Sequence, residues 1–124
     1  MNVVDSSAWL EYFAGGPNAR HFQAPIEDTE SLLVPTLALY EVFKRVMQQR
    51  GEGDALHTAA IMEQGVVVDL DRALALEAAR LSLEQSLPLA DSIMLATARA
   101  HGATLWTQDA DFDGLEGVRY YAKK

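Results

Sequence analysis

Short apolar runs alternate along the chain with longer stretches in which apolar residues recur every three or four positions. The short β-branched runs indicate strands, and the helical spacing indicates amphipathic helices. The expected strands are residues 2–5, 31–34, 66–70, 103–107 and 118–121. The expected helices are residues 6–14, a weaker stretch from residue 18 that Pro25 interrupts, and residues 36–50, 54–64, 72–86 and 89–101.

Capping and breaking residues support these boundaries. Ser6 or Ser7 is expected to cap the helix over 6–14, and Asp71 is expected to cap the helix over 72–86. Pro35 and Pro88 each precede a helix, where a missing backbone N–H does no harm. The element boundaries are therefore marked by residues with a physical reason to stand there.

The resulting order is β-α-α-β-α-α-β-α-α-β-β. Strands that alternate with helices indicate a parallel sheet with helices on both faces. We expect a three-layer α/β sandwich around a central, mainly parallel sheet of four to five strands. The sequence shows no repeat, linker or low-complexity segment, so residues 1–124 are expected to form a single domain.

Composition narrows the possible settings. The chain has 49% hydrophobic residues, as a globular protein does, and no cysteine, which excludes disulfides, cysteine-bound zinc and thiol catalysis. No apolar run approaches the length of a membrane span, and the N-terminus does not resemble a signal peptide. We therefore expect a cytoplasmic protein without a membrane partner. The net charge of −8 argues against a generally basic surface for nucleic acids.

Acidic residues follow two of the expected strands. Asp5 ends the first strand, and Asp109 lies two residues beyond Thr107, where the fourth strand ends. If both strands are central and parallel, their ends place Asp5 and Asp109 at the same edge of the sheet. The segment "DADFDG" also matches the first half of an EF-hand loop, but Tyr120 stands where that loop requires a glutamate, so an EF-hand is rejected.

Two further acids lie on helices, and the pattern alone leaves their roles open. Asp91 stands near the start of a helix that is apolar almost all round, so it is either a buried functional carboxylate or a group favoured by the helix dipole. Glu41 lies away from the apolar stripe of its helix, and periodicity favours a solvated pair with Arg45. Asp71 is expected to be a cap, and Asp69 and Asp113 are expected to be surface acids.

The chain resembles the PIN-domain ribonucleases, particularly the VapC-type toxins of toxin–antitoxin pairs. The resemblance runs nearly from end to end and rests on "VVDSSAWLEYF", "VPTLALYEVFKRV" and "LPLADSIMLATARAHGATLWTQDADF", in the order and spacing of that family. It implies an acidic quartet, supporting hydroxyl groups and one additional acid. The quartet falls on Asp5, Glu41, Asp91 and Asp109, the hydroxyls on Ser7 and Thr107, and the additional acid on Asp111.

The resemblance implies a metal-dependent endoribonuclease that cleaves RNA and leaves a 5′-phosphate. Asp5, Asp91 and Asp109 would bind the metal, and Glu41 would hold a metal-bound water or a second cation. A site made only of carboxylates suits Mg²⁺, or Mn²⁺, rather than zinc. The implied partners are the RNA substrate and a cognate antitoxin protein. A homodimer is expected as well, because the helix over 6–14 carries much apolar surface.

Alternatives remain at this stage. A response-regulator-like receiver domain has a similar length and order, but it needs paired acids after the first strand, and here Ser6 follows Asp5. A catalytically inactive interaction module of the same fold is a second alternative. Lys44, Arg45 and Arg50 either contact phosphates or form an ordinary solvated helix face.

Overall fold

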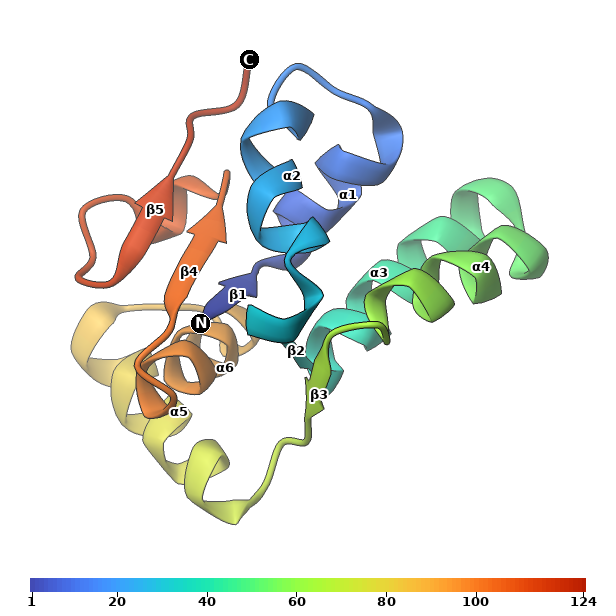
Figure 1. Cartoon of the computed structure of the whole chain (residues 1–124). Coiled ribbons are helices and arrows are strands. Elements are labelled where there is room, and N and C mark those ends of the chain that lie inside the picture. The colour runs from blue at the N-terminus through green and yellow to red at the C-terminus, as the bar shows by residue number, and fades with distance from the viewer.

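The computed structural model describes residues 1–124 and contains five strands, six α-helices and two short 3-10 helices (Figure 1). The strands are β1 (Asn2–Val4), β2 (Leu32–Pro35), β3 (Val66–Val68), β4 (Thr104–Thr107) and β5 (Val118–Tyr120). The α-helices are α1 (Ser6–Ala14), α2 (Ala19–Glu27), α3 (Thr36–Arg50), α4 (Glu52–Met62), α5 (Arg72–Gln85) and α6 (Leu89–Ala100). The 3-10 helices are η1 (Thr29–Ser31) and η2 (Ala110–Phe112). None of the helices combines the length and the apolar character that a membrane crossing requires.

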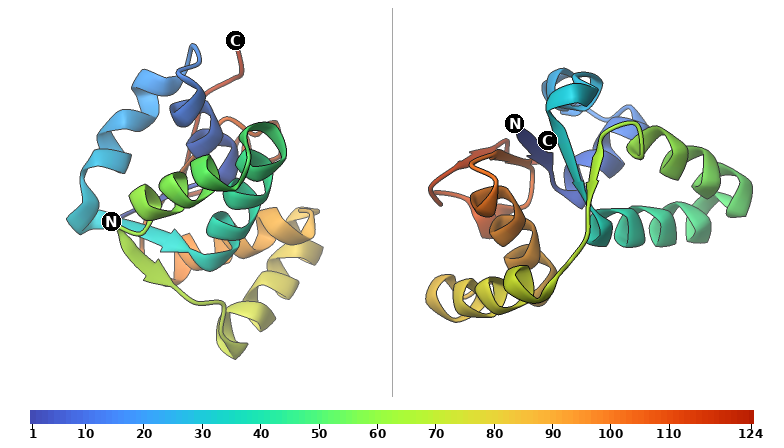
Figure 2. Two further views of the ribbon diagram at one scale, coloured as in Figure 1. Left: turned by 90° about the vertical axis from the view of Figure 1, so that its right-hand side faces the viewer. Right: turned by 60° about the horizontal axis from the view of Figure 1, so that its bottom comes forward.

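The strands form one sheet in the order β3-β2-β1-β4-β5, and every neighbouring pair is parallel. The connections from β1 to β2 and from β2 to β3 run in one direction along the sheet, whereas the connection from β3 to β4 runs back across it. Because such crossovers are right-handed, α1–α4 cover one face and α5 and α6 cover the other (Figure 1, Figure 2). The expected three-layer α/β sandwich is confirmed, with five strands.

The core lies between the sheet and its two helical layers. β1 and β2 are buried along almost their whole length, as central strands of a parallel sheet are. The largest fully buried side chains are Trp9 on α1, Phe22 on α2 and Phe112 on η2. On α6, every residue from Ser92 to Thr97 is buried, so this helix is held on all sides. Asp91 directly precedes that buried segment, which gives it a firmly positioned backbone.

Two local expectations about helices are wrong. Asp5, rather than Ser6 or Ser7, is the N-cap of α1, because its carboxylate accepts a hydrogen bond from the Ser7 N–H. Pro25 does not interrupt the second helix, since α2 continues through it to Glu27. Pro25 is buried together with its neighbour Ile26, and this packing offsets the backbone hydrogen bond that proline cannot make.

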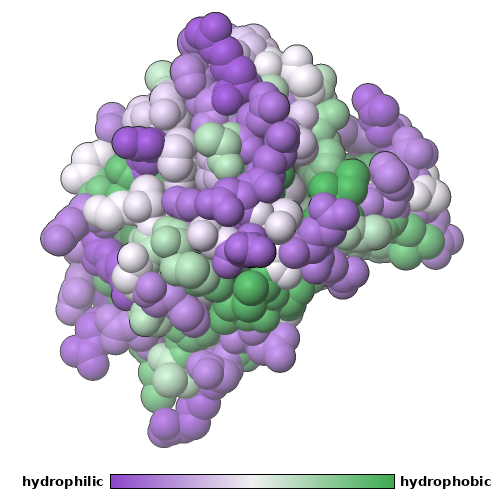
Figure 3. All heavy atoms as spheres, in the orientation of Figure 1, coloured by the Kyte–Doolittle hydropathy of each residue, from purple (hydrophilic) through white to green (hydrophobic).

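Apolar surface is exposed, but on α1 only in part. Trp9 is fully buried, and Leu10, Tyr12 and Phe13 are partly buried against the core. Apolar atoms gather instead around the β3 edge and over part of the α3–α4 pair (Figure 3). The exposed large apolar side chains are Tyr40, Met47, Leu56, Val66, Val67, Leu70, Leu76, Leu83 and Leu89, together with Met1. The homodimer stays a prediction, and the partly exposed Leu10, Tyr12 and Phe13 leave α1 a smaller share of its rationale than expected.

Candidate metal centre

The candidate site lies at the carboxyl edge of the sheet, between two central strands. β1 and β4 are neighbours, and β1 leads away to β2 on its other side, so the strand order reverses between β1 and β4. A crevice opens at such a reversal in parallel α/β sheets. Asp5 directly follows β1, and Asp109 follows β4 by two residues. Both strands are central and parallel, as the argument from the sequence required.

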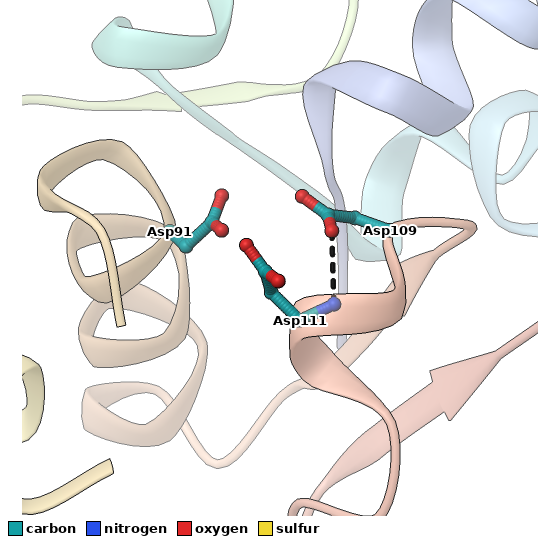
Figure 4. A group of neighbouring side chains, drawn as sticks. All are labelled: Asp91, Asp109 and Asp111. Carbon is teal, nitrogen blue, oxygen red and sulfur yellow. Dashed lines mark hydrogen bonds between the residues drawn. The ribbon is translucent and has the colours of Figure 1, made fainter. Parts of the chain in front are cut away.

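Three carboxylates converge at this edge (Figure 4). Asp91 lies in the first turn of α6, Asp109 is the N-cap of η2, and Asp111 lies within η2. Each offers one oxygen, and these three oxygens lie within 4.8 Å of one another. The Asp111 N–H donates a hydrogen bond of 2.9 Å to Asp109 Oδ1, which holds the turn that carries both residues. Two segments far apart in the sequence therefore form one acidic cluster.

Asp5 stands beside this cluster as a buried carboxylate with one saturated oxygen. Its side chain is only 4% exposed, and Oδ2 accepts hydrogen bonds from Ser7 Oγ at 2.7 Å and Thr107 Oγ1 at 3.0 Å. Oδ1 accepts no hydrogen bond, and it is not among the fully buried atoms that lack a partner. The structure therefore orients Asp5 through one oxygen and leaves the other free.

Thr107 connects the two strand-end acids. Its hydroxyl donates to Asp5 Oδ2 and accepts a hydrogen bond of 2.9 Å from the Asp109 N–H. Thr107 is fully buried at the end of β4, so this hydroxyl is held in a fixed place. The two hydroxyl residues that the family resemblance singled out, Ser7 and Thr107, lie 3.4 Å apart at their oxygens, and both contact Asp5.

Glu41 belongs to the site's surroundings through a contact with α1. Its Oε1 accepts a hydrogen bond of 2.8 Å from Ser6 Oγ, between residues 35 positions apart. Periodicity favoured a surface pair between Glu41 and Arg45, but the only ion pair in the structure joins Arg80 and Glu77. Glu41 is thus turned toward α1 and Asp5, and its charge is one of those that raise the pKa of Asp5.

The acids share one electrostatic environment. Burial raises the pKa of Asp5, and the charges of Asp109 and Glu41 add to that effect, while the hydrogen bonds from Ser7 and Thr107 oppose it. Burial, followed by the charges of Asp109 and Asp5, raises the pKa of Asp91 to about 8. In the absence of a cation, the neutral form of Asp91 is therefore favoured to a higher pH than that of a free aspartate. A bound cation would favour the ionised form of each carboxylate.

The donor set fits a hard divalent cation. Asp91, Asp109 and Asp111 offer only carboxylate oxygens, which are the ligands that Mg²⁺ and Mn²⁺ prefer. Two of the three histidines are engaged elsewhere, since His21 stacks on Tyr121 and His101 contacts the Thr97 carbonyl, and the third, His57, is exposed on α4. A site of this composition lacks the nitrogen and sulfur ligands that select zinc.

The remaining acids that the sequence placed outside the site lie outside it. Asp69 and Asp113 are exposed, and neither side chain makes a hydrogen bond or an ion pair. Asp71 accepts a hydrogen bond of 2.9 Å from the Leu74 N–H and caps α5, as expected. These three residues offer natural controls for the acids of the cluster.

Sequence reasoning missed three polar residues that support the site. Ser6 holds Glu41, and it was considered only as a helix cap. Gln108, which follows Thr107 and precedes Asp109 in the sequence, is buried. Its Oε1 accepts a hydrogen bond of 3.1 Å from Asn18 Nδ2. The only signal in the sequence was that Gln108 is a polar residue between the end of the fourth strand and Asp109. The contact with Asn18 joins residues 90 positions apart and depends on the tertiary fold.

Comparisons with known proteins agree with this architecture. The family model described as the PIN domain matches residues 3–118. No curated protein sequence matches the chain significantly. Among solved structures, a toxin–antitoxin complex from Klebsiella pneumoniae superposes with a TM-score of 0.83 at 24% identity, covering 98% of this chain and 99% of that one.

Two further structures are similar over nearly their whole length. Mycobacterium tuberculosis VapC20, a toxin that cleaves the sarcin–ricin loop, has a TM-score of 0.75 and 22% identity, covering 96% of this chain and 99% of that one. PAE2754 from Pyrobaculum aerophilum has a TM-score of 0.73 and 23% identity, covering 96% of this chain and 89% of that one. At these identities the likeness concerns the fold.

Proposed function

This chain belongs to the PIN-domain family, and we propose that it is a metal-dependent endoribonuclease that acts as the toxin of a toxin–antitoxin pair. The observation that carries the proposal is the convergence of Asp91, Asp109 and Asp111 at the carboxyl edge of the sheet, with their oxygens within 4.8 Å of one another. Membership of the PIN-domain family leaves the receiver-domain alternative without support. An inactive module of the same fold would have no need of three convergent carboxylates, which repel one another.

The cluster would hold Mg²⁺ or Mn²⁺ through carboxylate oxygens, with Asp5 Oδ1 as a further ligand. When bound, the cation would supply charge to stabilise the phosphodiester oxygens and would make water a stronger nucleophile. Ser7 and Thr107 keep Asp5 oriented by binding its Oδ2. This supporting role is why their hydroxyls belong to the proposed site.

In this proposal, Glu41 acts as the proton acceptor. Ser6 occupies Glu41 Oε1, so Oε2 is left to accept a hydrogen bond, and then a proton, from the attacking water. The water oxygen forms a bond to phosphorus as the bond from phosphorus to the 3′ oxygen breaks. The electron pair of the broken bond stays on the 3′ oxygen, which then takes up a proton. The products are a 5′-phosphate and a 3′-hydroxyl.

We further propose an antitoxin protein as the physiological partner and a homodimer as the working assembly. The solved structures with this fold include toxin–antitoxin complexes, which supports the first proposal. The exposed apolar side chains on α3–α6 and β3 support an assembly of some kind, because their burial would be favourable. Light scattering of the purified chain at micromolar concentration tests the dimer, and a monomer would contradict it.

We assign the activity to the cytoplasm, where a cysteine-free chain and cellular RNA would meet.

The test of the function is direct. The purified chain is incubated with end-labelled RNA in the presence of Mg²⁺, Mn²⁺ or EDTA, and the products are separated on a denaturing gel. We expect cleavage with either metal, 5′-phosphate ends on the products, and no cleavage in EDTA. Undiminished cleavage in the chelator, with the Asp109→Asn variant as the control for contaminating nuclease, would contradict the metal mechanism.

A further inference from the structure

A groove leads away from the acidic site between α1 and α3. It has a volume of about 340 Å³. Its lining includes Ser7 and Gln108, which stand next to the acids, and farther along it includes Arg45 and Lys123. Ser7 binds Asp5, and Gln108 directly precedes Asp109, so the groove begins where the acidic cluster ends.

The spacing on α3 explains why the groove and the site are continuous. Glu41, Arg45 and Gln49 are separated by four residues each, and residues four apart stand on the same side of a helix. Glu41 reaches Ser6 at the site, whereas Arg45 and Gln49 line the groove one and two turns farther along. One face of α3 thus changes from acidic to basic as it leaves the site.

The two cations of the groove have no ionic partner in the protein. Of the ten lysines and arginines in the chain, only Arg80 forms an ion pair, with Glu77. Arg45 and Lys123 therefore keep their charge available. Other cations are engaged differently, over an aromatic ring or on a backbone carbonyl; these are Lys44, Arg119 and Arg99. Lys44, which the sequence grouped with Arg45, lies over the Tyr40 ring and is not among the residues that line this groove.

The single acid in the groove lining is partly engaged. Glu11 Oε2 accepts a hydrogen bond of 2.7 Å from the Asn18 N–H. The groove continues into a second hollow of about 260 Å³, which shares Leu10, Ala14 and Gln49 with it. Arg50 lines this second hollow together with Asp54. Arg50 and Asp54 balance in charge, so the excess of cations lies in the first groove, on a molecule with a net charge of −8.

We propose that this groove binds the RNA strand, and that Arg45 and Lys123 hold a phosphate that neighbours the one to be cut. The proposal rests on the proposed function, which puts one phosphodiester at the acidic cluster. The next phosphate of the same strand must then lie nearby, and the groove offers it two unpaired cations and the amide donor of Gln49. A guanidinium can bind phosphate oxygens in a bidentate manner, so Arg45 is the principal contact. An acidic peptide would meet the same cations but would place no phosphodiester at the carboxylates.

The experiment compares Arg45→Gln, Lys123→Gln and the double variant with Arg72→Gln. Arg72 is an exposed arginine at the start of α5, on the other face of the sheet, and it forms no ion pair, so its variant carries the same change in charge. Two substrates are used with Mn²⁺: a labelled oligoribonucleotide, and bis(p-nitrophenyl) phosphate, a phosphodiester without neighbouring phosphates. Binding of the oligoribonucleotide is followed separately by fluorescence anisotropy in the Asp109→Asn background, where the strand is not expected to be cut.

We expect each groove variant to raise the KM for the oligoribonucleotide about tenfold, with kcat nearly unchanged. Hydrolysis of bis(p-nitrophenyl) phosphate should not change, and Arg72→Gln should resemble the wild type on both substrates. The slope of log affinity against log salt should fall by about 0.7 for each lost phosphate contact.

The outcomes separate this proposal from the proposed function. If the wild type cleaves RNA but Arg45→Gln and Lys123→Gln behave like Arg72→Gln, only the groove assignment is wrong. If the wild type cleaves neither substrate, the proposed function fails, and the anisotropy arm still decides whether the groove binds RNA. Equal loss on both substrates would overturn the groove assignment, because it would indicate damage to the acidic site. Competition by polyglutamate as strong as that by RNA of equal charge would overturn it too, because the groove would then bind any polyanion.

Discussion

Thr107 Oγ1 donates a buried hydrogen bond of 3.0 Å to Asp5 Oδ2. The same hydroxyl accepts the Asp109 N–H at 2.9 Å, so one side chain joins the acids that follow β1 and β4. The Asp5 N–H donates a further hydrogen bond of 2.9 Å to the Trp106 carbonyl on β4, whereas Asp109 stands two residues beyond the end of β4. The relative placement of the two carboxylates depends on this hydroxyl as well.

Thr107→Val should impair both stability and activity. The change keeps the shape of the side chain but leaves the partly buried Asp109 N–H without its partner and removes one donor from the buried Asp5, so the free energy of unfolding should fall by about 1–3 kcal/mol. Urea denaturation measures this loss, and RNA cleavage should fall as well. Thr104→Val is the matched control on the same strand, since the Thr104 side chain makes no hydrogen bond. Equal effects of the two substitutions would show that the bridging hydroxyl has no special role.

The stability of the metal-free protein should decrease as the pH rises. The pKa of Asp91 is raised to about 8 in the folded chain, from 3.8 in the unfolded reference. The folded state therefore binds more protons than the unfolded state between these values, so stability is fully present below about pH 4 and is lost as the pH rises toward 8. Thermal melting in EDTA at several pH values measures this dependence.

The Asp91→Asn variant and added Mg²⁺ test whether the pH dependence of stability comes from Asp91. Asp91→Asn should flatten the decline and raise the melting temperature at pH 8 by a few degrees, because about 1 kcal/mol corresponds to roughly 2–8 °C in small domains. Mg²⁺ should raise the melting temperature of the wild type more at pH 8 than at pH 5, because protons compete with the cation for Asp91. A decline that is identical in Asp91→Asn would assign the effect to other groups.

Glu41 and Ser6 should differ in the size of their effects on cleavage. Glu41→Gln keeps the hydrogen bond from Ser6 but removes the proton acceptor, so cleavage should fall about 100-fold or more. Ser6→Ala leaves the acceptor in place but frees its orientation, and a loss of about tenfold is expected. Glu84→Gln, on the exposed surface of α5, is the control. If Ser6→Ala proves as damaging as Glu41→Gln, Ser6 has a direct role beyond orientation.

Asp111→Asn should weaken the binding of Mg²⁺ or Mn²⁺ without abolishing it. Asp111 is the most exposed member of the cluster, and Asp91 and Asp109 would remain as ligands, so the loss of affinity should be about tenfold. Isothermal titration calorimetry measures the change. Asp113→Asn, two residues along the same loop, should leave the affinity unaltered. A larger loss from Asp113 than from Asp111 would mean that the loop presents different carboxylates to the cation.

The alternation of strands and helices was predictable because each element carries its own local signal. Apolar periodicity, the capping Asp71 and the prolines before α3 and α6 depend only on neighbouring residues, and the structure follows them closely. The parallel sheet followed from the alternation of strands with helices. The same logic placed Asp5 and Asp109 at one edge, since it required only that β1 and β4 be central.

Side-chain direction was less predictable because it depends on packing between distant segments. Periodicity favoured a surface pair between Glu41 and Arg45. The packing of α1 against α3 instead brings Glu41 within hydrogen-bonding distance of Ser6. Apolar residues on α1 suggested an exposed face, but the fold buries Trp9 completely. The roles of the individual acids stay predictions, because they concern a cation and a substrate rather than the folded chain.

In the proposed function, the acidic cluster cleaves RNA with the help of a divalent cation. The most direct test of that function measures cleavage of one labelled RNA by the wild type, Asp109→Asn and Asp113→Asn, side by side with Mg²⁺. We expect Asp109→Asn to lower the rate at least about 100-fold while circular dichroism shows an intact fold, because this change removes a ligand charge and keeps the shape of the side chain. Asp113→Asn should cleave at the wild-type rate. Full activity of Asp109→Asn would contradict the account, as would a requirement for Asp113 in its place.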